Sequence, residues 1–176
     1  MKFSISLTSG TDRAISAGEI TDFAQQAEAL DYHAIYITDH YYHNHPNFHS
    51  VSAAAVLCAA TRRVKLGFSA YQVPLRHPIA VAKKFTMLDA LSEGRFIAAL
   101  ATGSYDKEFE AFGIPFNKRG RMMDEGIRAI KRLWTEDSVD FEGDFWSFEN
   151  VSVKPKPVQK PHLPIWIASS RSRSVN

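Results

Sequence analysis

A histidine next to an aspartate follows one of the strand-like segments of this sequence. The strand-like run is Ala34–Thr38, and Asp39 and His40 come directly after it. A histidine can donate or accept a proton near neutral pH, and a neighbouring carboxylate can orient its ring. Because adjacent residues of an extended strand point to opposite faces, Asp39 contacts the His40 ring only if the chain bends there. The pair therefore indicates proton-handling chemistry, while a loop histidine that merely faces solvent remains the alternative.

Two further strand-like runs, Val64–Ser69 and Arg95–Ala101, end in small side chains. In parallel barrels the working groups lie where strands end at the carboxyl face, so these positions are candidate ligand contacts. They are the strand ends Ser69–Gln72 and Ala101–Ser104, which include Ser69, Ala70, Thr102 and Gly103. Gly103 would let a planar ligand approach the backbone closely, or it would serve a tight turn. The chain has no G-x-G-x-x-G and no P-loop, which excludes these two kinds of nucleotide cradle.

A cluster of histidines in the same loop raises the question of a metal site. The four are His40, His43, His45 and His49. Imidazole is a common zinc ligand, but this spacing matches no structural zinc pattern and no cysteine lies nearby. We therefore expect no metal, and we expect these side chains to line the mouth of a site or to decorate a loop.

Composition describes an ordinary globular chain of 176 residues, 45% hydrophobic and 23% charged, for which one domain spanning 1–176 is expected. The single cysteine, Cys58, cannot form an internal disulfide, and no signal peptide is visible, so we expect a cytoplasmic protein.

Apolar runs are far shorter than the roughly 20 residues that span a bilayer, so no membrane insertion is expected. The formal charge is +2 and the basic residues are scattered, so nucleic acid is not an expected partner.

Strand-like and helix-like segments alternate along the chain, which indicates an α/β fold with a parallel sheet. The expected strands are 3–7, 34–38, 64–69, 95–101 and 165–168, and the expected helices begin near residues 17, 51, 78 and 119. Ser16 and Glu19 form a capping box before the first helix. The stretch 105–113 reads as a short polar piece, 139–148 as an inserted β-hairpin, and the proline-rich 154–164 as an extended connector.

Taken together, ordered motifs along about 160 residues resemble the luciferase-like flavin-dependent oxidoreductases, which include bacterial luciferase and deazaflavin-dependent dehydrogenases. The resemblance runs through Ala27–Tyr32, Tyr36–His40, Pro74–Pro78, Leu88–Arg95, Glu108–Gly113, Leu133–Thr135 and Pro155–Gln159. Several motifs in order are more specific than any one of them. The resemblance implies a (β/α)8 TIM-barrel fold with the flavin ring in the mouth at the carboxyl ends of the strands.

The resemblance also implies roles for individual residues. His40 matches the active-site histidine, and Asp39 matches the acidic residue that precedes it in many members. Ser69 and Ala70 match the place of a bulge or a non-prolyl cis peptide behind the ring. Thr102 and Gly103 match ring-side contacts. Ser104 stands where deazaflavin-dependent sugar-phosphate dehydrogenases look to carry a glutamate, which argues against that substrate.

The cofactor implied is reduced FMN, used with dioxygen, or alternatively a deazaflavin (coenzyme F420) for hydride transfer on a small organic substrate. A separate flavin reductase is a candidate partner. A complete barrel has eight strands and roughly 250 residues, whereas this chain has five expected strands in 176 residues. We therefore expect an incomplete barrel that is truncated at the C-terminus. Exposed strand edges favour a homo-oligomer, and the alternative function is a non-catalytic flavin-binding or self-assembling half-barrel.

Overall fold

The chain forms alternating strands and helices in a computed structural model that describes residues 1–8, 13–43 and 47–168. The order is β1 (Ser4–Leu7), α1 (Ala17–Ala29), β2 (Ala34–Ile37), α2 (Ser50–Ala60), β3 (Lys65–Phe68), β4 (Tyr71–Gln72), α3 (Pro78–Leu91), β5 (Phe96–Ala101), α4 (Asp106–Ala111), α5 (Arg119–Thr135), β6 (Val139–Glu142), β7 (Ser147–Val151) and β8 (Ile165–Ala168). Short 3-10 turns at Val73–Leu75 and Phe116–Lys118 precede α3 and α5.

The main sheet is parallel, and its strands follow one another in the order β1-β2-β3-β5, with β8 and the short β4 both pairing with β5. Leu66 lies opposite Ile35 on β2 and Phe96 on β5, so neighbouring strands stay in register. β5 is apolar along its whole length and almost entirely buried, as a parallel strand covered on both faces should be. The carboxyl ends of these strands therefore meet at one edge of the sheet.

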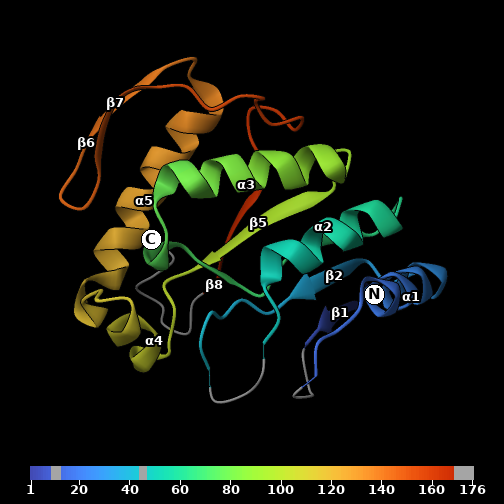
Figure 1. Cartoon of the computed structure of the whole chain (residues 1–176). Helices are drawn as coiled ribbons and strands as arrows, with labels where there is room; N and C mark the ends of the chain where they lie inside the picture. The colour runs from blue at the N-terminus through green and yellow to red at the C-terminus, as the bar shows by residue number, and fades with distance from the viewer. Residues whose placement is uncertain (9–12, 44–46, 169–176) are drawn as a thin grey trace.

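A row of helices covers one side of this sheet. α1 packs beside α2, α2 beside α3, and α3 beside α5, and Figure 1 shows α1, α2 and α3 lying in front of the strands. The capping box predicted at Ser16 and Glu19 is present. Pro78 is the first residue of α3, where its missing N–H costs no hydrogen bond. The sheet, its five principal strands and its helices form an incomplete TIM barrel within the described residues, with β6 and β7 as a separate antiparallel hairpin.

Large apolar side chains fill the space between the sheet and the helices. Phe68, Phe85 and Phe96 are fully buried and meet edge to face. Trp134 from α5 donates its indole N–H to the carbonyl of Ala82 on α3 at 3.1 Å, which satisfies a buried polar group. Cys58 is fully buried in this core, and burial raises the pKa of its thiol to about 12.

Two elements differ from the sequence prediction. Residues 106–111 form helix α4 where the sequence suggested only a polar piece. The hairpin predicted over 139–148 extends to Val151, and residues 145 and 146 lie outside its second strand, which begins at Ser147. The reason is that the backbone N–H groups of Asp144, Phe145 and Trp146 all donate to the carboxylate of Glu125 on α5, so they are unavailable to the hairpin ladder.

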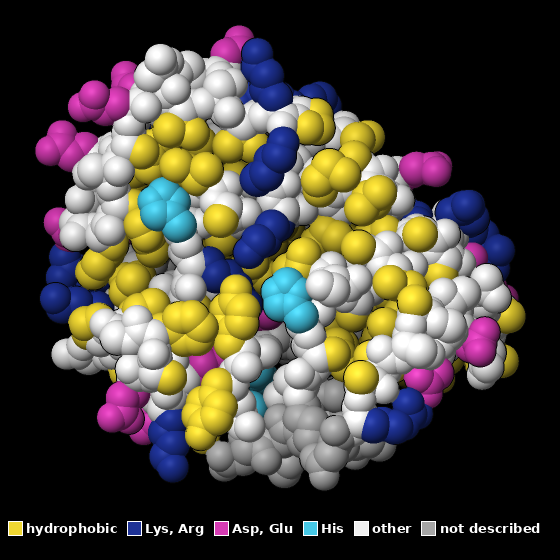
Figure 2. Space-filling view, viewed as in Figure 1, with side chains coloured by type: hydrophobic (Ala, Val, Ile, Leu, Met, Phe, Trp, Pro, Cys, Tyr) yellow, Lys and Arg dark blue, Asp and Glu magenta, His cyan; other side chains and the backbone are white. Residues whose placement is uncertain are grey.

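The outer surface mixes apolar and charged groups. Figure 2 shows hydrophobic side chains on this face with Lys and Arg side chains interspersed among them, and Met87 and Leu91 of α3 are among the exposed apolar residues of the chain. In the part of the chain that the structure describes, no helix is both long and apolar enough to cross a membrane.

Candidate functional site

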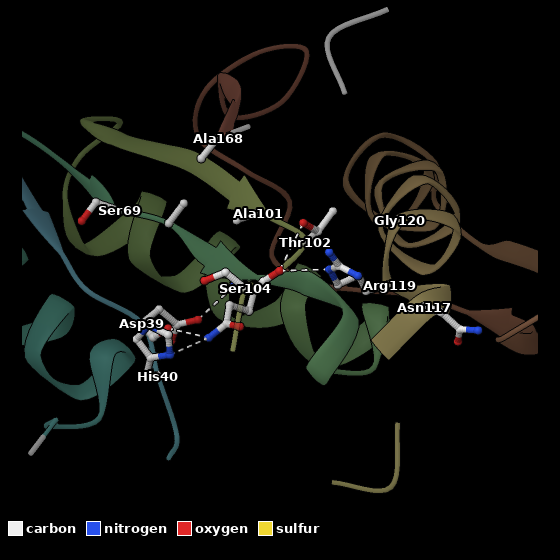
Figure 3. A pocket seen from close by; sticks show the side chains of 13 residues that line it. Asp39, His40, Ser69, Ala101, Thr102, Ser104, Asn117, Arg119, Gly120 and Ala168 are labelled. Atoms are coloured by element: carbon white, nitrogen blue, oxygen red, sulfur yellow. Dashed lines mark hydrogen bonds between the residues drawn. The ribbon is translucent and has the colours of Figure 1, made fainter. Parts of the chain in front are cut away.

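A cavity of about 670 Å³ opens at the carboxyl ends of the parallel strands. Figure 3 shows the side chains that line it, drawn from the ends of β2, β3, β5 and β8 and from the start of α5. The lining residues are Asp39, His40, Ser69, Ala70, Gln72, Ala101, Thr102, Gly103, Ser104, Asn117, Arg119, Gly120 and Ala168. All six residues that the sequence predicted for the site are therefore brought together around one cavity.

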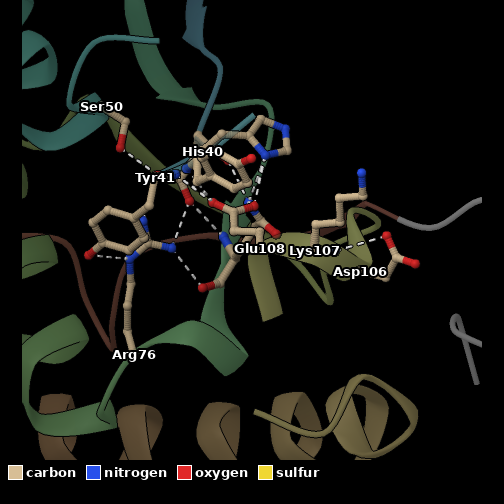
Figure 4. Close-up of polar contacts among 10 residues, drawn as sticks. His40, Tyr41, Ser50, Arg76, Asp106, Lys107 and Glu108 are labelled. Carbon is tan, nitrogen blue, oxygen red and sulfur yellow. Dashed lines mark hydrogen bonds and ion pairs between the residues drawn. The ribbon is translucent and has the colours of Figure 1, made fainter. Parts of the chain in front are cut away.

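The His40 ring is held by the carboxylate of Glu108. Its Nδ1 lies 2.9 Å from Oε2 of Glu108, a residue of α4 whose side chain is fully buried, while the His40 side chain is 25% exposed (Figure 4). Glu108 also accepts hydrogen bonds from the backbone N–H groups of Tyr41 and Tyr42 and from Nε2 of Gln72. The orienting carboxylate that the sequence suggested at Asp39 is thus supplied by Glu108.

These hydrogen bonds fix the charge of Glu108 and the tautomer of His40. Burial alone would raise the pKa of Glu108, but the bonds from His40, Gln72 and the two backbone N–H groups outweigh it and lower the pKa to about 2. The carboxylate is therefore ionised at neutral pH and can only accept, so Nδ1 of His40 carries the proton and donates the hydrogen bond. Nε2 of a neutral His40 ring is then the nitrogen that keeps its lone pair, and it can accept a proton.

The ionisation of Glu108 should make the free energy of unfolding depend on pH in the acid range. Its pKa is about 2 when folded against 4.5 for an ordinary glutamate, so its contribution, on the order of 3 kcal/mol, is complete above about pH 5 and is lost as the pH falls toward 2. We expect the difference in unfolding free energy between wild type and Glu108→Gln to shrink over that range, measured by urea unfolding at several pH values. Glu110→Gln, an exposed neighbour on α4, is the matched control. A difference that stays constant from pH 7 to pH 3 would contradict this assignment.

Asp39 occupies a different place in the site. Both of its carboxylate oxygens lie 2.8 Å from the guanidinium of Arg76, and the side chains are 1% and 4% exposed. Its carboxylate also accepts from Oγ of Ser50 at 2.6 Å and from the backbone N–H of Gln72 at 2.9 Å. Asp39 therefore lines the cavity and ties β2 to the segment after β3, and the partners of its carboxylate are Arg76, Ser50 and Gln72.

Small residues follow β3 and β5 where these strands reach the cavity. The Ser69–Ala70 peptide bond is cis, which is one of the two features, a bulge or a non-prolyl cis peptide, that the family resemblance implied here. Gly103, after β5, has a positive φ of 82°. A Cβ added there would lie 2.4 Å from Oε1 of Gln72 and 2.7 Å from the ring of Phe109, so only glycine fits. The position thus needs glycine both for its backbone conformation and for its close approach to Gln72.

Gly103→Ala should disturb the site through Gln72, whose Nε2 bonds the carbonyl of Asp39 at 2.7 Å and Glu108 at 2.9 Å. We expect a loss of about 1–3 kcal/mol in unfolding free energy from overpacking and backbone strain, measured by chemical denaturation. Gly120→Ala is the control, because Gly120 lines the same cavity and an added Cβ meets nothing within 4 Å. Equal effects of the two substitutions would show that the Gln72 contact is unimportant.

The sequence missed several cavity residues. Glu108 lies in one of the motifs that carry the family resemblance, and that motif is the signal that could have found it. Gln72 belongs to the strand end Ser69–Gln72 that the sequence singled out, but its hydrogen bonds depend on the short β4 and could not be predicted. Arg119 had no such signal, because its place depends on the loop before α5. Within the described residues, no group of three or more metal-ligating side chains converges; His45 of the histidine cluster lies outside them.

The fold and the cavity together define an α/β barrel-type protein with a cavity at the carboxyl ends of its parallel strands. The chain belongs to the luciferase-like monooxygenase family, whose model matches residues 1–176. Both the fold class and the family resemblance inferred from the sequence are thereby confirmed.

Three relatives illustrate the range of this family. The chain is 34% identical over 157 residues to the oxygenase component of a flavin-dependent trigonelline monooxygenase of Acinetobacter baylyi, covering 86% of this chain and 42% of that protein. It is 35% identical over 160 residues to an F420-dependent glucose-6-phosphate dehydrogenase of Kineococcus radiotolerans, covering 86% and 47%. The monooxygenase RslO1 of Streptomyces bottropensis superposes with a TM-score of 0.89 at 32% identity, covering 99% of this chain and 55% of that one. The chain thus spans about half the length of these relatives.

Proposed function

We propose that this chain provides the ring-facing part of a flavin-dependent oxidoreductase that acts on a small organic molecule. The observation that carries the proposal is the His40 ring, held by the buried, ionised Glu108 at the edge of a cavity that is lined in part by small residues. That combination places a proton acceptor beside a space that a planar ring can enter.

The residues present fit a flavin ring. A cavity of about 670 Å³ is within the usual range for cofactor sites. Ala70, Ala101, Gly103 and Ala168 leave a wall free of bulky groups, and at Gly103 the space that a Cβ would fill is already occupied by Gln72. The proposed contacts are those predicted from the sequence, namely Asp39, Ser69, Ala70, Thr102 and Gly103.

The chain's own groups would then have three tasks. His40 accepts or returns a proton at Nε2, because Nδ1 is engaged by Glu108. The Asp39–Arg76 pair holds the β2 and β3 ends in place behind the site. The small residues let the ring lie against the backbone and exclude water from that face. When bound, reduced flavin would supply electrons for oxygen chemistry and a deazaflavin would exchange hydride.

We propose reduced FMN as the cofactor, supplied by a separate flavin reductase, with coenzyme F420 as the alternative. An oxygenase component and an F420-dependent dehydrogenase match this chain at similar identity, so identity does not choose between them. We prefer FMN because it serves the broader class of the family. Ser104, which lines the cavity, argues only against a sugar-phosphate substrate.

Fluorescence titration of the purified protein with FMN and with F420 tests this function. We expect FMN to bind and lumiflavin, the ring without a phosphate tail, to compete with it, since the cavity contacts proposed here are to the ring. FMN supplied with a reductase and NADH would then be screened for product formation from a panel of small molecules by mass spectrometry. Failure of both FMN and F420 to bind would overturn the proposal.

A second candidate is a non-catalytic protein that binds flavin or assembles with itself. Within the described residues β1 pairs only with β2, and β8 only with β5, and Trp166 on β8 is 50% exposed. Unpaired parallel edges with exposed apolar side chains favour association with another strand. Light scattering would distinguish a monomer from a homo-oligomer, and a stable oligomer that binds no flavin would favour this candidate. A single domain over 1–176 and a cytoplasmic location stay predictions.

A further inference from the structure

We propose that Gln72 is a positioning residue: its side-chain amide holds the carboxylate of Glu108 and thereby limits how strongly the His40 ring attracts a proton. The inference deepens the proposed function and rests on it in taking His40 as the group that moves a proton. Gln72 is the last residue of the short strand β4, lines the cavity and is 2% exposed. Because it is polar and buried, its hydrogen bonds decide what it contributes to the site.

The amide of Gln72 has a fixed orientation. Its Nε2 donates to the backbone carbonyl of Asp39 at 2.7 Å and to Oε2 of Glu108 at 2.9 Å. Both of these partners can only accept a hydrogen bond. Its Oε1 lies against Gly103, 2.4 Å from where a Cβ of that residue would be, and has no hydrogen-bond partner among the described residues. Turning the amide over would set Oε1 against two other acceptors, so Nε2 stays a double donor.

Gln72 and His40 donate to the same oxygen of Glu108. Nδ1 of His40 and Nε2 of Gln72 each lie 2.9 Å from Oε2, and the two nitrogens lie 3.2 Å apart. Burial raises the pKa of Glu108, and the bonds from His40 and Gln72 are the leading causes that lower it to about 2. Because both protons of Nε2 go to oxygens, Nδ1 keeps its own proton and donates it to Oε2.

A second donor on Oε2 weakens the attraction between Glu108 and a protonated His40 ring. The bond from Gln72 draws on the negative charge of that oxygen, so the imidazolium gains less from it than from an oxygen that it does not share. Gln72 thus keeps Glu108 ionised and also keeps His40 from holding a proton too tightly. A general base must give up its proton again before the next turnover, so this balance matters for the proposed reaction.

Other titratable groups near the His40 ring come from the loop after β2 and from the segment before α4. Besides Glu108 they are Asp39, His43 and Tyr105. The centre of the His43 ring lies 4.7 Å from the centres of both the His40 and Tyr105 rings, and the Asp39 carboxylate is paired with Arg76. Since neighbouring histidines titrate together, each comparison is also made in a His43→Asn background.

NMR spectroscopy of the flavin-free protein tests the inference. Proton–nitrogen correlation spectra of the imidazole rings report which nitrogen of His40 carries the proton and at what pH the ring titrates. The variants are Gln72→Met, which has a similar length and no donor, Glu108→Gln, and the two combined. The control is Gln26→Met, at an exposed glutamine of α1.

We expect neutral His40 of the wild type to carry its proton on Nδ1. Gln72→Met should raise the pH at which the ring titrates by about one unit, a tenfold gain in proton affinity, and Gln26→Met should leave it unchanged. Most of the shift should disappear in the Glu108→Gln background, because the amide acts through that carboxylate. With a substrate in hand, the acid limb of the pH profile of kcat/KM should move up by the same amount.

Three results would overturn the inference: a neutral His40 protonated on Nε2, a Gln72→Met ring that titrates at or below the wild-type pH, and a full shift that survives in Glu108→Gln. If Gln72→Met does not fold, the wild type still decides, because rapid exchange of either side-chain N–H of Gln72 with water would contradict the double donor. These measurements need no flavin. A protein that gives the expected spectra and yet binds neither FMN nor F420 would refute the proposed function alone.

Discussion

His40→Asn is expected to lower turnover by roughly 100-fold or more while leaving flavin affinity nearly unchanged. General acid–base assistance from a positioned side chain is worth about 100-fold to 10,000-fold. Asparagine can still place a polar atom near Glu108 but cannot exchange a proton at neutral pH. The measurement is the turnover number on a substrate found by the product screen, together with FMN affinity from fluorescence titration.

The control is His49→Asn, since His49 is an exposed residue before α2 that does not line the cavity. Its turnover should match that of the wild type. Added imidazole should restore part of the turnover of a His40→Gly variant, which a purely structural role would not allow. Unchanged turnover in His40→Asn would remove His40 from the mechanism.

The sequence correctly predicted the elements whose signals lie in residues close together in the chain. The capping box at Ser16 and Glu19, the proline at the start of α3 and the apolar run of β5 are local signals, and each leads to the observed element. The cavity residues at the strand ends were also predictable, because parallel strands bring their carboxyl ends to one edge. That rule placed Ser69 beside Thr102 and Gly103, although more than 30 positions separate it from them in the chain.

What the sequence could not predict are contacts between distant polar groups. Asp39 precedes His40, yet the carboxylate that holds the ring belongs to Glu108, 68 positions along the chain. This contact depends on helix α4, which lies in the stretch 105–113 where the sequence predicted a short polar segment and no helix. The partner of Asp39, Arg76, is separated from it by 37 positions. Such pairs are set by the register of β2 against β3 and by the turn after β4, which no local pattern encodes.

The Asp39–Arg76 pair carries the second large expected effect. The two side chains form a two-pronged ion pair, and Arg76 also donates to the backbone carbonyl of Gln72 at 2.8 Å. Its guanidinium lies between the rings of Tyr41 and Tyr71, 4.3 and 4.1 Å from their centres. Removing one member of a buried pair leaves the other charge without a partner in a site that water does not reach, which typically costs about 3–5 kcal/mol.

We therefore expect Arg76→Met to lower the unfolding free energy by about 3–5 kcal/mol, measured by urea denaturation at pH 7. Adding Asp39→Asn to Arg76→Met should recover part of this loss, because the orphaned carboxylate is then gone. Arg132→Met is the control: Arg132 forms a comparable pair with Glu136, but both side chains are 42% exposed, so its loss should be far smaller. A cost for Arg76→Met no greater than that for Arg132→Met would show that the pair does not hold the strand ends together.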